Sequence, residues 1–361
     1  METKLSRALA CRWRRWLAAA LLGAVSCLAL PPFAMTALLV PVFVGLSLLL
    51  AACRTPAGAF ALGWIFGLGH FTAGLYWVGT AFSVAGVAPW AAPFAVLGLA
   101  AANALFPGLA LLVAFLAPVR GSLSALVLAT SWTAAEWLRA NLVLGGFPWN
   151  LLGYVWVDSL SMLQAASVFG IYGLSWLAVL AAAIPSALFW EARAWRTLAL
   201  TWGLVAMVGL AGTMRLPDHE SAVVEGVSLR LVQANIVQYH KWQPELRAEN
   251  LRRHLALTAA PGAAPTVVIW PETATPYLLT QEPEIRERIG AALPVGGLLI
   301  TGAVRGEPDG QGGMHVWNSL HAIDGHGALV GTYDKFHLVP FGEYMPLRSI
   351  FDLAKLSHGE T

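Results

Sequence analysis

The chain of 361 residues is 57% hydrophobic and only 12% charged, with a mean hydropathy of +0.64, which excludes an ordinary soluble protein and indicates a membrane protein. Its formal net charge of +2 conceals two unlike parts, because residues 1–215 carry 11 Lys and Arg against 4 Asp and Glu, whereas residues 216–361 carry 11 against 16. We therefore expect a membrane part and a water-facing part, and the acidity of the second excludes nucleic acid as a partner.

Residues 1–215 contain apolar segments that approach the roughly 20 residues needed to cross a bilayer. We expect seven spanning helices, at 16–30, 33–52, 57–82, 90–118, 123–138, 160–190 and 198–214. Arg12, Arg14 and Arg15 precede the first segment, as in a secretory signal peptide, but six more apolar segments follow at short spacing. The pattern therefore favours a membrane anchor and a polytopic helical bundle.

Basic residues alternate between the short loops that join these segments. They gather before the first segment and recur at Arg54, Arg120, Arg193 and Arg196, whereas the other loops are nearly free of them. Because basic loops stay in the cytoplasm, we expect the amino terminus inside and everything after residue 215 on the opposite face. Arg139 lies one helical turn from Glu136 near that outer face, and we expect the two side chains to pair.

Residues 216–361 alternate β-rich runs with helical stretches, which predicts an α/β domain. Strands are expected at 228–236, 266–270, 297–304, 318–323 and 328–333, the last two joined as a hairpin around Asp324-Gly325-His326-Gly327. Helices are expected at 243–260 and 282–293. The domain boundary is therefore placed between residues 215 and 216.

Three polar residues follow apolar runs in this second part, where reactive groups of open α/β sheets gather. Glu272 comes directly after the strand that ends at Trp270, and under an aromatic cover it would serve as a general base. Lys335 follows another strand, where its ammonium would stabilise a developing oxyanion. Glu343 comes eight residues later. The alternatives are a solvated carboxylate in a turn and an ordinary surface lysine.

The motif Trp270-Pro271-Glu272, together with residues 333–347 (YDKFHLVPFGEYMPL), resembles apolipoprotein N-acyltransferase of bacteria, a membrane member of the nitrilase (carbon–nitrogen hydrolase) superfamily. Residues 231–236 (LVQANI), 146–150 (GFPWN) and 317–319 (WNS) are also similar to family segments, as is Lys241-Trp242. The resemblance implies a polytopic transmembrane domain of seven helices over residues 1–215. It further implies an incomplete nitrilase-like α-β-β-α sandwich over residues 216–361.

The resemblance also implies an activity, a location and a set of site residues. A cysteine takes a fatty acyl chain from a phospholipid, typically phosphatidylethanolamine, and passes it to the amino terminus of a diacylglyceryl-cysteine lipoprotein in the bacterial inner membrane, with the catalytic domain on the periplasmic face. By motif match Glu272 is the general base, Lys335 stabilises the oxyanion and Glu343 is a further essential carboxylate. Trp242 and Asn318 are the expected substrate-binding residues. No cofactor or metal is implied.

The chain departs from the family pattern in its cysteines. Cys11, Cys27 and Cys53 all precede residue 54, in the membrane part, so none is expected to reach a site on the outer face. In the family the nucleophile follows the carboxylate that matches Glu343, and a last spanning helix closes the chain. We therefore expect a C-terminally truncated chain that is inactive by itself. A membrane-bound amidase or hydrolase, or a non-catalytic lipid- or lipoprotein-binding remnant, are the alternatives.

Overall fold

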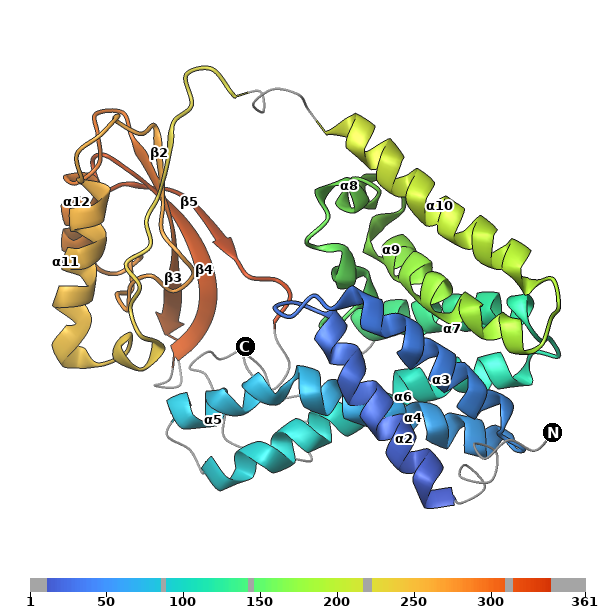
Figure 1. The fold of residues 1–361 in the computed structure, drawn as a ribbon. Coiled ribbons are helices and arrows are strands. Elements are labelled where there is room, and N and C mark those ends of the chain that lie inside the picture. Colours follow the sequence, from blue (N-terminus) through green and yellow to red (C-terminus); the bar gives the residue numbers. More distant parts are fainter. Residues whose placement is uncertain (1–11, 86–88, 142–145, 217–222, 309–313, 339–361) are drawn as a thin grey trace. The chain divides into compact units, whose positions relative to one another are not determined.

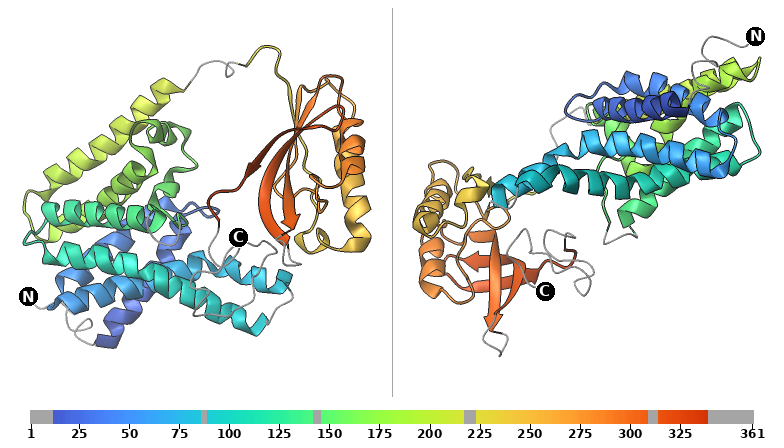
Figure 2. Two further views of the ribbon diagram at one scale, coloured as in Figure 1. Left: turned by 180° about the vertical axis from the view of Figure 1, so that it is seen from behind. Right: turned by 90° about the horizontal axis from the view of Figure 1, so that it is seen from below.

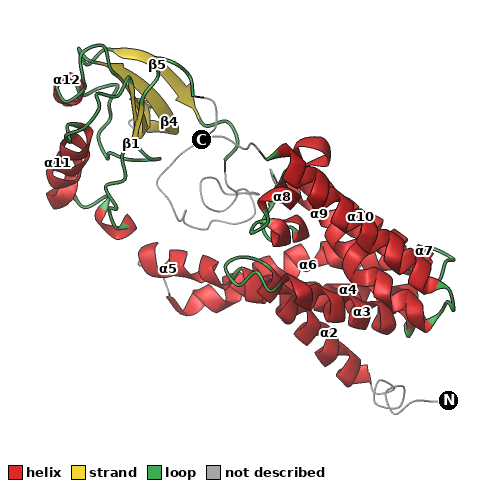
Figure 3. Cartoon of the chain, turned by 45° about the horizontal axis from the view of Figure 1, so that its top comes forward, coloured by secondary structure: helices red, strands yellow, loops and turns green. Residues whose placement is uncertain are grey.

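The computed structural model describes residues 12–85, 89–141, 146–216, 223–308 and 314–338. Two compact units divide the chain. We call residues 1–82 and 88–220 the helical unit, and residues 221–361 with residues 83–87 the sheet unit. Figure 3 shows that helices form the regular structure of the first unit and that the strands belong to the second. The division after the helical unit lies at 220/221, and the predicted domain organisation with its boundary at 215/216 stays a prediction.

A helix lies in each of the seven apolar segments (Figure 1). The helices are α2 (Arg12–Ser26), α3 (Leu39–Ala51), α4 (Pro56–Gly74) with α5 (Thr80–Ala85), α6 (Ala92–Leu116), α7 (Ser122–Asn141), α8 (Leu160–Leu163) with α9 (Ala166–Ala183), and α10 (Ala194–Arg215). Among the described residues, Pro89–Leu116, Ala166–Phe189 and Ala194–Arg215 are long and apolar enough to cross a membrane. The pair Pro56–Gly74 and Tyr76–Phe82, bent by 57°, makes a fourth candidate. The number of seven spans stays a prediction.

Helix α4 is central to the helical unit, because α2 and α6 both pack against it (Figure 2). Gly63 permits the close approach to α6, since a Cβ there would lie 2.3 Å from the carbonyl oxygen of Pro107. Buried aromatic rings fill the core nearby: the ring centroids of Phe43 and Phe66 lie 5.3 and 5.7 Å from that of Trp132.

Helix α7 carries two buried charged residues, Glu136 and Arg139, which are 5% and 2% exposed. One carboxylate oxygen of Glu136 accepts hydrogen bonds from the backbone N–H of Leu152 at 2.9 Å and from the Trp132 indole at 3.1 Å. The Arg139 guanidinium donates to the carbonyl oxygens of Phe147 and Trp149 at 2.6 and 2.7 Å. The expectation that the two side chains pair was wrong, because among the described residues no ion pair within 4.0 Å joins them, and both instead fasten the segment 147–152 to α7.

The sheet unit contains one five-stranded sheet in the order β1-β2-β3-β4-β5. Strands β1 (Leu229–Leu231), β2 (Val267–Ile269) and β3 (Leu298–Pro308) are parallel, and β4 (Met314–Asp324) and β5 (Leu329–Asp334) continue the sheet antiparallel. All five expected strands are present. The predicted length of the first strand, 228–236, was wrong, because β1 ends at Leu231. The predicted lengths of β3 and β4 were also wrong, because the two strands pair as far as Pro308 and Met314, through polar residues that hide the strand pattern.

Helices α11 (Arg247–Thr258) and α12 (Pro283–Gly290) cover one face of this sheet (Figure 1). Both were expected from the sequence. Fully buried Leu251 and Ile289 of the helices meet Val268, Leu299 and Ile323 of the three middle strands. The opposite face carries apolar side chains that remain exposed, among them Leu231 of β1 at 74%, and Leu320 and Tyr333 of β4 and β5. The sheet unit is therefore a two-layer α/β structure in the part of the chain that the structure describes.

Candidate active site

Glu272 stands two residues beyond a buried anchor at the end of β2. Trp270 is 3% exposed, its backbone N–H donates to the Ile300 carbonyl, and its indole N–H donates to the Thr258 hydroxyl at 2.9 Å. The indole lies on the helix side of the sheet, beside the ring of His254 at 4.8 Å. It therefore holds the end of β2 in place, but it does not cover Glu272, whose side chain is 65% exposed. The aromatic cover expected over Glu272 is thus not supplied by Trp270.

The segment after Trp270 crosses directly over Gly302 of β3. The Gly302 N–H donates to the Pro271 carbonyl at 3.3 Å, and the Ala274 N–H donates to the Gly302 carbonyl at 2.9 Å. A Cβ on residue 302 would lie 2.7 Å from both the Glu272 Cα and the Thr273 nitrogen. Thr273 itself has a φ of +48°, in the left-handed region. The backbone of Glu272 and Thr273 thus packs directly against Gly302, the one position of β3 contacted here that has no side chain.

We expect Gly302→Ala to reduce the free energy of unfolding by about 1–3 kcal/mol, because the added methyl group meets backbone atoms that must shift. Gly331→Ala is the matched control, since a Cβ there would have its nearest neighbour, the Ala322 Cβ, at 3.8 Å. The control should stay within about 0.5 kcal/mol of the parent protein. Thermal or denaturant unfolding of the purified proteins compares the two variants. Equal reductions in the free energy of unfolding would contradict the close packing of the Glu272 backbone on Gly302.

Asn318 and Lys335 converge on the Glu272 carboxylate from the neighbouring strands β4 and β5. The Asn318 amide donates to Oε1 of Glu272 at 2.5 Å, and the Lys335 Nζ lies 3.5 Å from the same oxygen. The Lys335 backbone N–H also donates to the Asn318 carbonyl at 2.8 Å. A carboxylate, an amide N–H donor and an ammonium therefore meet at one point, which can accept a proton and stabilise an oxyanion.

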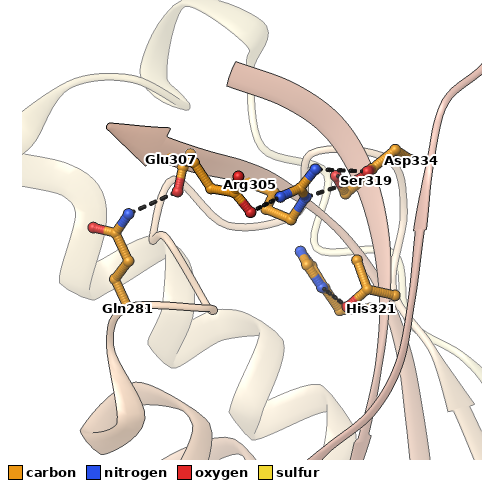
Figure 4. Close-up of polar contacts among 8 residues, drawn as sticks. Gln281, Arg305, Glu307, Ser319, His321 and Asp334 are labelled. Atoms are coloured by element: carbon orange, nitrogen blue, oxygen red, sulfur yellow. Dashed lines mark hydrogen bonds and ion pairs between the residues drawn. The ribbon is translucent and has the colours of Figure 1, made fainter. Parts of the chain in front are cut away.

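A second polar cluster lies on the opposite face of the sheet and fixes the end of β5 (Figure 4). The Arg305 Nε and Nη2 donate to the two carboxylate oxygens of Asp334 at 3.0 and 2.7 Å, and the Ser319 hydroxyl donates to Asp334 at 2.6 Å. The guanidinium, which also pairs with Glu307, lies 3.8 Å from the centroid of the Trp317 ring. Hydrogen bonding from Arg305 lowers the pKa of Asp334, so the pair stays charged at neutral pH.

The Arg305–Asp334 pair matters to the site because Asp334 directly precedes Lys335. Side chains of successive residues in a strand point to opposite faces of the sheet. The ion pair that joins Asp334 to β3 on one face therefore fixes the backbone position from which the Lys335 side chain extends on the other face. Sequence reasoning named Lys335 and missed Arg305 and Gly302. Arg305 could have been found, because an arginine within an apolar strand usually has a charged partner. Nothing in the sequence distinguished Gly302 from the other 34 glycines.

Trp242 lies beside this site, in a shallow pocket that Lys241, Trp242, Asn250, Thr273, Ala274 and Pro276 line. Its side chain is 42% exposed, and the preceding Lys241 Nζ donates to the main-chain carbonyl oxygen of Glu272 at 3.4 Å. The structure thus brings Glu272, Asn318 and Lys335 together with the pocket at Trp242. Glu343 lies outside the described residues. Within the residues described, no group of three or more His, Cys, Asp or Glu side chains is placed to hold a metal ion.

Comparison with known proteins identifies similar sequences along nearly the whole chain. The family profile described as the apolipoprotein N-acyltransferase N-terminal domain matches residues 22–184. An apolipoprotein N-acyltransferase of Allorhizobium ampelinum is 41% identical, over 95% of this chain and 67% of that protein. The protein of the same name from Rhodopseudomonas palustris is 39% identical, over 95% and 68%, and that from Brucella suis 41% identical, over 93% and 66%. The chain spans about two thirds of the length of these relatives.

Proposed function

Because this chain belongs to the apolipoprotein N-acyltransferase family, we propose that it contributes the proton acceptor and the oxyanion-stabilising groups for transfer of a fatty acyl chain from a phospholipid to the N-terminal amine of a diacylglyceryl-cysteine apolipoprotein. This is the last step of bacterial lipoprotein maturation. The observation that carries the proposal is the meeting of Glu272, Asn318 and Lys335, because acyl transfer needs both a proton acceptor and cationic or N–H donors at one carbonyl. Phosphatidylethanolamine is the proposed donor.

In the proposed mechanism Glu272 accepts the proton of a cysteine thiol, and the thiolate attacks the ester carbonyl carbon of the phospholipid. Lys335 and the Asn318 amide stabilise the oxyanion, the C–O bond breaks, and the lysophospholipid oxygen leaves with the proton from Glu272. The acceptor amine then attacks the thioester carbonyl carbon and gives up a proton to Glu272, the C–S bond breaks, and the leaving thiolate takes that proton from Glu272 to restore the thiol. Glu343 and Trp242 are assigned to positioning the site and to contacting substrate.

The three cysteines of these 361 residues, Cys11, Cys27 and Cys53, belong to the membrane part, and we assign none of them as the nucleophile. Cys27 has a separate role in the helical unit, where its thiol donates to the His70 carbonyl at 2.8 Å. The thiol of Cys53 lies 3.5 Å from the Leu49 carbonyl of its own helix. The prediction that residues 1–361 alone transfer no acyl chain stays a prediction.

We also propose that the sheet unit is part of a nitrilase-like α-β-β-α sandwich. The exposed apolar face of the sheet supports this, because Leu229, Leu231, Leu320 and Tyr333 are each more than two fifths exposed on the side away from α11 and α12. An apolar sheet face normally packs against another layer. In a sandwich, a second sheet would cover these side chains.

The proposed location is the bacterial inner membrane, with the sheet unit on the periplasmic face. Single cysteines that replace exposed residues on the two sides test this in a background without Cys11, Cys27 and Cys53. We expect a membrane-impermeant maleimide, applied to intact spheroplasts, to label His326→Cys in the β4–β5 turn and to spare Ala192→Cys in the loop before α10. The reverse pattern would overturn the proposed sidedness, and permeabilised cells, in which both sites should react, provide the control.

Product analysis tests the proposed activity against the hydrolase and the non-catalytic binding protein. The gene product, purified in detergent, is given a phospholipid with labelled acyl chains and a diacylglyceryl-cysteine peptide. Transfer predicts labelled N-acyl peptide and lysophospholipid in equal amounts. Labelled free fatty acid, unchanged by the peptide, would instead identify a hydrolase, and binding of both substrates without any product would support the binding protein.

A further inference from the structure

We propose that Lys241, together with Trp242, forms a subsite for the phosphate group of the acyl donor. The inference rests on the proposed function and deepens it, because it assigns one part of the donor to one pocket of the sheet unit. The pocket shares its wall with the backbone that carries Glu272, through Thr273 and Ala274. No role in the acyl transfer described above has yet been assigned to Lys241.

The side chains around the pocket indicate what it can bind. They combine the ammonium of Lys241, the half-exposed indole of Trp242 and the hydroxyl of Thr273, next to Glu272, a set that fits an anion with an apolar neighbour. The pocket is a shallow depression with almost no enclosed volume, so it cannot enclose acyl chains.

The charges near Glu272 favour an anion there. Lys335 lies 3.5 Å from the carboxylate, and Lys241 donates to the main-chain carbonyl of the same residue, so two cations accompany one anion. An ammonium has three N–H donors, and within the described residues the side chain of Lys241 donates to the carbonyl of Glu272 alone. The remaining donors can bind phosphate oxygens. An amine would be repelled, which excludes the N-terminus of the acceptor from this pocket.

The surrounding contacts hold the subsite in shape. The Asn250 amide, 5% exposed, donates to the His240 carbonyl at 3.1 Å and so ties the residue before Lys241 to α11. On the far wall Arg247 donates to the Pro276 carbonyl at 3.2 Å and lies over the Tyr277 ring. Lys241 therefore starts from a fixed backbone beside Glu272.

The covalent structure of a phospholipid places its phosphate close to the ester that reacts, as the subsite requires. In a phospholipid the phosphate and the reacting ester are attached to the same glycerol, a few bonds apart. When the ester carbonyl lies at Glu272 and Lys335, the phosphate must lie close by. Lys241, whose Nζ lies 3.4 Å from the Glu272 carbonyl oxygen, is the cation placed to bind it.

The test compares donors with and without phosphate in detergent micelles. With phosphatidylethanolamine, Lys241→Gln should raise KM by about ten- to a hundredfold and change kcat by less than about twofold, because a hydrogen-bonded charge pair is lost. With diacylglycerol of the same acyl chains, which has the ester but no phosphate, parent and variant should have equal KM values. Lys241→Arg should keep most of the phospholipid affinity.

Two results would overturn the subsite: an unchanged KM for the phospholipid, or an equal rise for both donors. Arg253→Gln is the matched control for loss of one positive charge, because Arg253 is 54% exposed on α11 and pairs with Glu249. It should leave both KM values unchanged. Failure of the proposed function is seen separately, since the product analysis described above would then yield no labelled N-acyl peptide from the parent protein, whereas failure of the subsite alone leaves that product and its dependence on Glu272 unchanged.

Discussion

Replacing Glu272 by Gln is expected to lower the rate of acyl transfer by about 10²- to 10⁴-fold, because Gln keeps the shape of the side chain and loses the proton acceptor. The side chain is 65% exposed, so the substitution should change the free energy of unfolding very little. The melting temperature of the variant should therefore equal that of the parent protein within the error of the measurement. Rates of N-acyl peptide formation and unfolding curves, measured on the same preparations, give both quantities.

Lys335→Met should cost about 10²- to 10³-fold in kcat, since one charged donor to the oxyanion is removed. Lys335→Arg should recover part of the rate, because the charge returns with a different geometry. Glu245→Gln, an exposed carboxylate of the same unit, is the control for Glu272 and should leave the rate unchanged. If Glu272→Gln and Glu245→Gln transferred acyl chains equally fast, Glu272 would have no place in the mechanism.

The elements of the sheet unit could be predicted because their cores have clear local patterns. Val267-Val268-Ile269 is apolar and β-branched, and the residue at its centre, Val268, is fully buried in the core between sheet and helices. The same reasoning gave α11 and α12. It placed Glu272 correctly after β2, because Pro271 cannot continue a strand.

Partners across strands could not be predicted, because they depend on register. Asn318 contacts Glu272 from 46 residues away, and Arg305 meets Asp334 across β4, between strands that the sequence alone does not align. The need for Gly302 is visible only once the segment after Trp270 is seen to cross it. The site residues were thus named from a motif, whereas the contacts that position them came from the structure.

Hydropathy located the apolar segments of the helical unit but not their breaks. The segment 160–190 is divided between α8, α9 and a 3-10 turn at Ile184–Phe189, and α9 is kinked at Phe169 and Gly170, where Gly170 has a φ of +65°. The segment 57–82 bends by 57° around Leu75. A run of apolar side chains is stable in the lipid bilayer whether the helix that carries it is continuous or interrupted. Hydropathy therefore does not distinguish a straight helix from a broken one.

Arg139→Met should be the most destabilising single change in the helical unit, at about 3–5 kcal/mol, because it leaves the buried Glu136 carboxylate without its neighbouring cation. It also removes the donor to the Phe147 and Trp149 carbonyls and the cation over the Phe71 ring, at 4.9 Å. Thermal unfolding in detergent measures the loss. Arg120→Met, which removes an exposed arginine from the loop before α7, should change the stability by less than about 0.5 kcal/mol.

A second substitution separates the lost charge from the lost hydrogen bonds. Glu136→Gln removes the carboxylate charge but keeps an oxygen that can accept from the Leu152 N–H and the Trp132 indole. If an uncompensated buried charge causes most of the damage, Glu136→Gln combined with Arg139→Met should be more stable than Arg139→Met alone. If the double variant is instead less stable by the sum of the two single losses, the segment 147–152 is held by hydrogen bonds alone, and the charges of Glu136 and Arg139 do not support each other.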